Sequence, residues 1–108
     1  MADESRVAAL QDILKDNPAD AFARYALGLE YSGSGDTDAA LAEFAKLIES
    51  HPDYTNGYFM AAQALARAER IDEARAMLQS GIASAQRTNN RHALSEMEAM
   101  LEELEHGN

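Results

Sequence analysis

Apolar and polar residues alternate along the first part of the chain with the period of an α-helix. Within residues 3–17, the apolar positions Val7, Leu10, Ile13 and Leu14 recur every three to four residues. Such spacing places them on one face of a helix, which can then bury a single stripe. The sequence therefore predicts an amphipathic helix over this segment.

Short polar segments containing proline or glycine interrupt the remaining apolar pattern. Pro18 and Pro52 each lie in a polar corner, where the missing N–H of proline is tolerated at a helix start but not inside a helix. The glycines of 32–36 permit a helix stop, and the turn at 68–71 lacks them. A last apolar stripe consists of Leu94, Met97, Leu101 and Leu104. Together these signals predict about six helices.

The chain repeats itself at a shift of 34 residues. The matching positions are Pro18 with Pro52, Tyr25 with Phe59, Asp38 with Asp72, Ala40 with Ala74, and Phe44 with Leu78. Leu10 and Leu14 extend the same register backwards by one further period. A period of this length, filled by two helices, is typical of stacked helical hairpins. We therefore expect an all-α chain.

The repeated positions resemble the tetratricopeptide repeat, a 34-residue helix-turn-helix unit. The first unit carries its signature at Leu27-Gly28, Tyr31, Gly35-Asp36, Ala40, Phe44 and Pro52. The second unit is more degenerate, with Tyr58, Ala61-Ala62, Leu65, Ala74 and Leu78, and it ends at Gln86 where the family usually has proline. The resemblance implies a right-handed α-solenoid of antiparallel hairpins in one domain over 1–108. Its parts would be an N-terminal half-repeat helix at 3–17, repeats at 19–52 and 53–87, and a capping helix at 90–106.

One departure from the family pattern lies in the first unit. Arg24 stands where the repeat usually has a large aromatic residue, so we expect Phe22 or Tyr25 to take over that packing.

The resemblance implies a protein-protein interaction module that binds a peptide or a helical segment of a partner on its concave surface. The partner-binding residues would be Phe22, Tyr25, Leu29, Phe59, Gln63 and Arg67. Equivalent aromatic positions one repeat apart could instead be core residues, and both interpretations remain open. The Lys, Asn and Arg residues with which some members grip chaperone C-termini are replaced here by Tyr25, Leu29 and Met60, so that clamp is missing.

Composition narrows the possible partners. Nine Lys and Arg oppose 19 Asp and Glu, for a formal net charge of −10, which argues against binding to nucleic acid. The excess of carboxylates fits solvated helix faces, and adaptation to high salt is the alternative. The chain has no cysteine. We see no apolar run long enough to span a membrane and no signal peptide, so a cytoplasmic protein is expected, although a domain cut from a longer polypeptide would look the same.

No motif indicates an enzyme, a metal site or a cofactor. His51, His92 and His106 are scattered, and the single i, i+4 pair of His92 with Glu96 provides too few ligands for a metal. The main alternative to a partner-binding module is a self-associating assembly protein, a homo-oligomer formed through exposed solenoid surface. The adaptable methionines Met77, Met97 and Met100 could serve such an interface.

Overall fold

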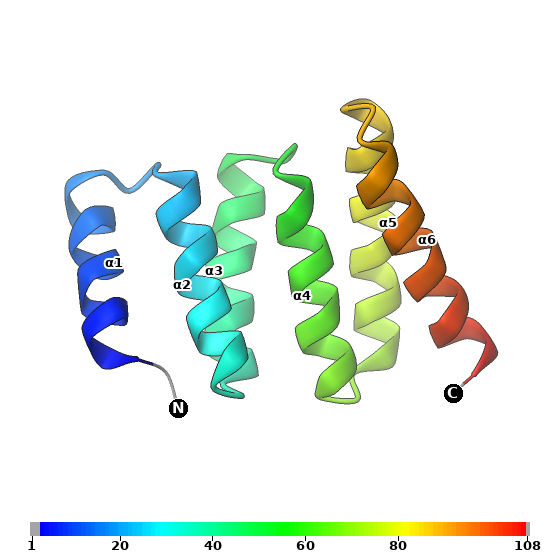
Figure 1. Ribbon diagram of the computed structural model, residues 1–108, viewed down its shortest axis with the longest axis horizontal. Helices are drawn as coiled ribbons and strands as arrows, with labels where there is room; N and C mark the ends of the chain where they lie inside the picture. The colour runs from blue at the N-terminus through cyan, green and yellow to red at the C-terminus, as the bar shows by residue number, and fades with distance from the viewer. Residues whose placement is uncertain (1–2, 108) are drawn as a thin grey trace. The chain divides into compact units, whose positions relative to one another are not determined.

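A computed structural model describes residues 3–107 as helices joined by short turns, with no strand between Asp3 and Gly107 (Figure 1). The helices are α1 (Glu4–Asp16), α2 (Ala21–Gly33), α3 (Thr37–Ser50), α4 (Thr55–Arg67), α5 (Ile71–Arg87) and α6 (Arg91–His106). The predicted all-α class with about six helices is confirmed. None of the described helices is long and apolar enough to cross a membrane. The chain divides into two compact units, Met1–His51 and Pro52–Asn108.

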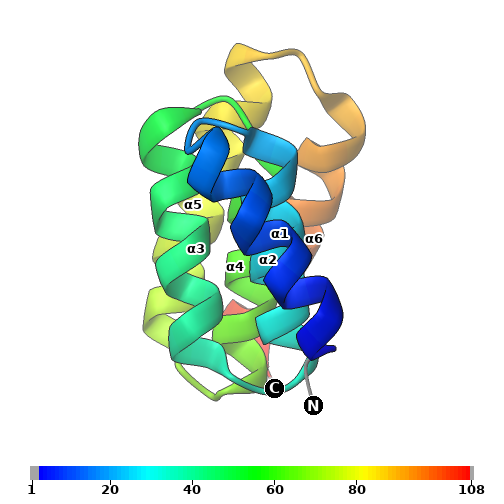
Figure 2. The same ribbon diagram turned by 90° about the vertical axis from the view of Figure 1, so that its left-hand side faces the viewer.

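In the first unit, α1 crosses α2 at an angle and covers one of its sides (Figure 2). The buried contact consists of Leu10 and Leu14 from α1 with Ala23 and Leu27 from α2. Full burial of a leucine side chain contributes about 1.5–3 kcal/mol to the free energy of folding. The stripe predicted over 3–17 therefore anchors α1, while Ile13 on the same helix stays 45% exposed.

Hydrogen bonds to a charged side chain also connect the start of α1 to α2. The Arg6 guanidinium donates to Glu30 over 2.7 Å, and the backbone N–H of Asp3 donates to the same carboxylate over 3.1 Å. These two hydrogen bonds lower the pKa of Glu30, and the bond to Glu30 raises the pKa of Arg6.

The contact between α2 and α3 depends on a glycine facing an aromatic ring. A Cβ at Gly28 would lie 2.6 Å from Cε1 of Phe44, closer than two carbon atoms can approach. Phe44 is 1% exposed, and its ring centroid lies 6.4 Å from that of Tyr25. Gly28 is thus required because its missing side chain leaves room for the Phe44 ring.

Arg24 substitutes for the aromatic residue of the repeat by forming hydrogen bonds. In the second unit Tyr58 donates its hydroxyl to the carbonyl of Pro52 over 2.7 Å. One repeat earlier, Arg24 donates to the carbonyl of Pro18 over 3.0 Å, so both side chains bond the equivalent proline. Arg24 also forms an ion pair of 2.9 Å with Glu43, and the two side chains are only 17% and 13% exposed. Of the two aromatic residues expected to compensate, Tyr25 packs against Phe44 and Phe22 is 70% exposed.

In the second unit α5 packs against both α4 and α6, and the three helices meet closely at Gly81. A Cβ at Gly81 would lie 2.5 Å from Sδ of Met97 on α6 and 2.7 Å from Cβ of Tyr58 on α4. Met97 is completely buried, as its place in the last apolar stripe predicts, so its expected part in a self-association interface is wrong. Near this junction, the buried hydroxyls of Thr55 and Ser84 pair at 2.9 Å, which satisfies both polar groups.

The turns inside the two hairpins have the same backbone shape but different residues. Gly35 has a φ of 84°, and Glu69, one period later, has a φ of 62°. After these residues, Asp36 caps α3 by accepting a hydrogen bond from the Ala39 amide, whereas Arg70 provides no side-chain cap for α5. The second turn therefore holds a glutamate in the left-handed region that favours glycine.

Replacing Glu69 by glycine should raise the free energy of unfolding by about 0.5–1 kcal/mol, because glycine adopts a positive φ without steric cost. The greater loss of backbone entropy by glycine on folding offsets only part of this gain. Urea unfolding followed by circular dichroism measures the change. Asn89, with a φ of 54°, is the matched control, since asparagine tolerates this region and Asn89→Gly should gain less. Equal or lower stability of Glu69→Gly would show that the turn stores no strain.

Candidate functional site

The three predicted binding residues of the first unit lie on α2 with different exposure. Phe22 is 70% exposed, while Tyr25 and Leu29 are partly buried. The contact of Tyr25 with Phe44 makes Tyr25 partly a core residue. Phe22 is the most accessible aromatic side chain of this set.

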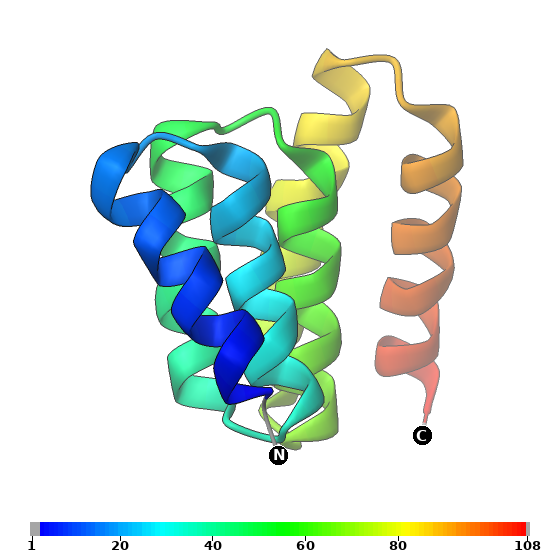
Figure 3. The same cartoon turned by 60° about the vertical axis from the view of Figure 1, so that its left-hand side comes forward.

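The three predicted residues of the second unit line one pocket. Phe59, Gln63 and Arg67 follow one another at four-residue intervals on α4, so they lie along one face of that helix. They border a cavity of about 530 Å³ between α4 and α6, two helices that Figure 3 shows from the side. The remaining lining residues are Ala66 of α4 and Glu96, Ala99, Met100 and Glu103 of α6. We call this cavity the α4–α6 pocket.

The α6 side of this pocket was not predicted from the sequence. The 34-residue register places Glu96 opposite Gly28 and Ala62, so α6 does not keep the small residue with which the repeat packs. A signal did exist in the spacing, because Glu96, Ala99, Met100 and Glu103 are separated by three, four and seven residues and share a helix face.

The α4–α6 pocket combines an apolar floor with a charged rim. Phe59 and Met100 are partly buried, and Ala66 and Ala99 complete the apolar part. On the rim, Glu96 lies 3.3 Å from Nε2 of His92, an ion pair that exists only when the histidine is protonated. Pockets that bind ligands usually show this arrangement of apolar walls with a few polar groups.

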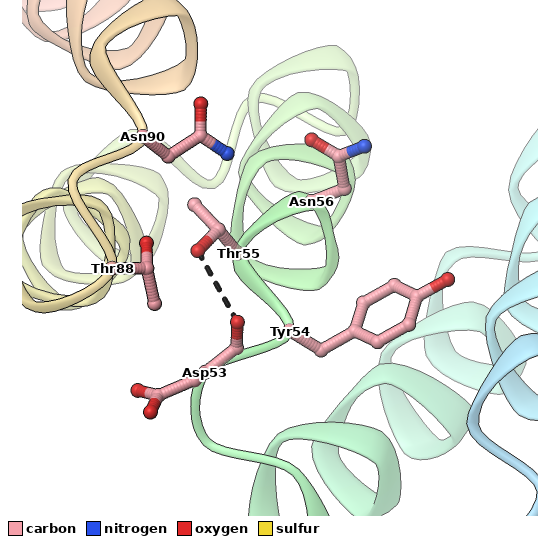
Figure 4. A pocket seen from close by; sticks show the side chains of 6 residues that line it. All are labelled: Asp53, Tyr54, Thr55, Asn56, Thr88 and Asn90. Atoms are coloured by element: carbon pink, nitrogen blue, oxygen red, sulfur yellow. Dashed lines mark hydrogen bonds between the residues drawn. The ribbon is translucent and has the colours of Figure 1, made fainter.

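A second pocket lies at the loops that precede α4 and α6 (Figure 4). Its lining residues are Asp53, Tyr54, Thr55, Asn56, Thr88 and Asn90. Burial raises the pKa of Tyr54 above its usual value. Most of the other polar groups bond within the chain: Asp53 accepts from Arg87, Thr55 pairs with Ser84, and Asn90 caps α6. These groups stabilise the turns and leave little polar capacity for a ligand.

Within residues 3–107 no three His, Cys, Asp or Glu side chains come close enough together to hold a metal ion. The described carboxylates with a lowered pKa are Glu30 and Glu73, and each is explained by hydrogen bonds from neighbouring groups, an arginine being the main partner of Glu73. Neither carboxylate lines the α4–α6 pocket.

Comparison with known proteins gives the same family over residues 1–102. One tetratricopeptide-repeat profile matches residues 31–102, and a second matches 1–59. The chain is 26% identical over 99 residues to a TPR repeat-containing protein of Pseudomonas aeruginosa, covering 92% of this chain and 94% of that protein.

Solved structures show the same architecture. The solution structure of a tetratricopeptide repeat domain protein from Salinibacter ruber is 32% identical and superimposes with a TM-score of 0.76, covering 82% of this chain and 90% of that one. The TPR2B domain of yeast Sti1, solved as a complex with pHsp70, is 20% identical and has a TM-score of 0.85 over 92% of this chain and 79% of that one. With its 34-residue period, its helical hairpins and these matches, the chain belongs to the tetratricopeptide-repeat family.

Proposed function

We propose that this chain is a non-catalytic protein-interaction module that binds a peptide or a helix of a partner protein. The tetratricopeptide-repeat fold is a protein-interaction fold, and the Sti1 domain that shares it is solved in complex with pHsp70. The proposed contact residues are Phe22, Tyr25 and Leu29 of α2 together with Phe59, Gln63 and Arg67 of α4. They occupy the first helix of each hairpin, the helix that lines the binding surface in this family.

The observation that carries this proposal is the α4–α6 pocket. It places a partly buried aromatic ring, Phe59, beside polar side chains in a cavity large enough for a partner side chain. Phe22 adds an exposed aromatic ring on α2. Aromatic side chains of this kind often dominate the free energy of protein-protein binding.

The double substitution Phe22→Ala, Phe59→Ala should weaken partner binding about tenfold or more, because each large aromatic contact in an interface contributes about 1 kcal/mol or more. Partners captured from a lysate of the source cells by the native chain would be compared with those captured by the variant, and circular dichroism would confirm that the variant is folded. Phe22 is a better probe than Tyr25, since truncation of Tyr25 also removes a contact with Phe44.

Ile13→Ala is the matched control, because Ile13 is an exposed apolar residue of α1 outside the proposed surface. It should leave capture unchanged. Equal capture by the native chain, the double variant and Ile13→Ala would mean that the partner binds a different surface. A native chain that captures nothing and elutes as a dimer would instead support self-association.

A further inference from the structure

The rim of the α4–α6 pocket has opposite chemistry on its two sides. The α6 side carries the carboxylates Glu96 and Glu103, and the α4 side carries Gln63 and Arg67. Beyond His92 the sequence contains five glutamates and neither lysine nor arginine. A cation held over the α6 side of the pocket is therefore stabilised by these carboxylates.

The two carboxylates are spaced like positions on a single partner helix. Glu96 and Glu103 are two helical turns apart, about 10 Å along the axis at 1.5 Å per residue. A partner helix lying alongside α6 matches this span with residues i and i+7, and it then directs residues i+3 and i+4 towards the same face. In an extended segment, a separation of about 10 Å corresponds to three residues, which point to opposite sides. The spacing favours a helix.

We infer that the α4–α6 pocket binds an amphipathic partner helix with an apolar anchor side chain between two basic residues seven positions apart. The anchor packs on Phe59, Ala99 and Met100, and the two cations pair with Glu96 and Glu103. This inference rests on the proposed function and specifies the partner for the second unit. A second copy of this chain does not fit, because no two of its nine Lys and Arg residues are seven positions apart.

The test is a selection from a phage-displayed library of random 16-residue peptides on the native chain. Peptides with Lys or Arg at i and i+7 and a Leu, Met or Phe at i+3 or i+4 should be enriched. A synthetic peptide of the enriched class should bind Glu96→Gln, Glu103→Gln about five- to tenfold more weakly than the native chain, as expected for two exposed ion pairs.

The matched control is Glu98→Gln, Glu105→Gln, which makes the same change of charge at the same spacing on α6. Glu98 and Glu105 border a different surface depression, with Ile82 and Leu101. This variant should bind the peptide within about twofold of the native affinity, because charges away from the contact are screened by salt. Circular dichroism of both variants checks that α6 remains folded.

Each of the following results would overturn the inference. Selected peptides without the basic pair would contradict the partner chemistry, and equal weakening in the two charge variants would indicate general attraction to an acidic surface. A concentration-dependent dimer that Glu96→Gln, Glu103→Gln dissociates would assign the pocket to a second copy. Selected peptides without the basic pair that bind the native chain but not the Phe22→Ala, Phe59→Ala variant would support the proposed function and contradict this inference.

Discussion

Replacing Phe44 by alanine is expected to lower the free energy of unfolding by about 3–5 kcal/mol, the usual cost of truncating a buried aromatic side chain. Phe44 is 1% exposed, contacts the ring of Tyr25, and fills the space that Gly28 leaves open. Gly28 cannot fill the cavity that the substitution leaves, because it has no side chain. Urea unfolding followed by circular dichroism measures the loss.

Phe22→Ala provides the control for this measurement, since it removes the same atoms from a side chain that is 70% exposed. Its effect should remain within about 0.5 kcal/mol. Similar losses for the two variants would mean that Phe44 does not support the packing of α2 against α3.

Removing residues 90–108 is expected to destabilise the second unit and to cause aggregation. Met97 of α6 is completely buried against Gly81, and its truncation to alanine alone would cost about 2–5 kcal/mol. Without α6, the apolar surface of α5 and the floor of the α4–α6 pocket become exposed to water, and terminal helices of this kind keep solenoids soluble. Size-exclusion chromatography and urea unfolding of the shortened chain measure both effects.

Removal of α6 also removes negative charge, so a second variant separates the two causes. This variant removes three negative charges from exposed positions of α6 and keeps Met97 in place: Glu98→Gln, Glu102→Gln, Glu105→Gln. This variant should remain monomeric and folded. A shortened chain that is monomeric and as stable as the native one would contradict the assignment of α6 as a cap.

The positions of the helices could be predicted because their signals are local or periodic. Pro18, Pro52 and Gly35 mark corners and a turn through the backbone angles that these residues allow. The period of 34 residues then identifies which apolar positions are equivalent. Met97 could be recognised as a core residue in the same way, from its place in the stripe of α6.

The role of Arg24 could not be predicted from the sequence, because it depends on groups that only the folded chain brings together. The Pro18 carbonyl is six residues away and Glu43 is on the next helix. Of the two aromatic residues expected to compensate, Phe22 does not, because it is 70% exposed, while Tyr25 packs against Phe44.

The α6 half of the α4–α6 pocket was not predicted either, because its spacing shows a shared helix face but not which helix that face meets. The family resemblance indicated Phe59, Gln63 and Arg67 because they lie on a regular repeat helix. Glu96 and Met100 belong to α6, where Glu96 stands in place of the small residue of the repeat, so nothing in the period connects them with α4. That all these residues bind a partner remains a prediction.

The hydrogen bond from Arg24 to the Pro18 carbonyl has a consequence for how the repeat can vary. The equivalent bond in the second unit comes from a neutral tyrosine, and the position equivalent to Glu43 is Met77. An arginine that is only 17% exposed needs a counter-charge, which Glu43 provides. A tyrosine in place of Arg24 would leave the largely buried carboxylate of Glu43 without its ion pair. Within this chain the two positions differ together, with tyrosine and methionine in the second unit and arginine and glutamate in the first. The first unit thus lacks the aromatic residue of the repeat and still bonds its corner, with an acid 19 residues later as counter-charge.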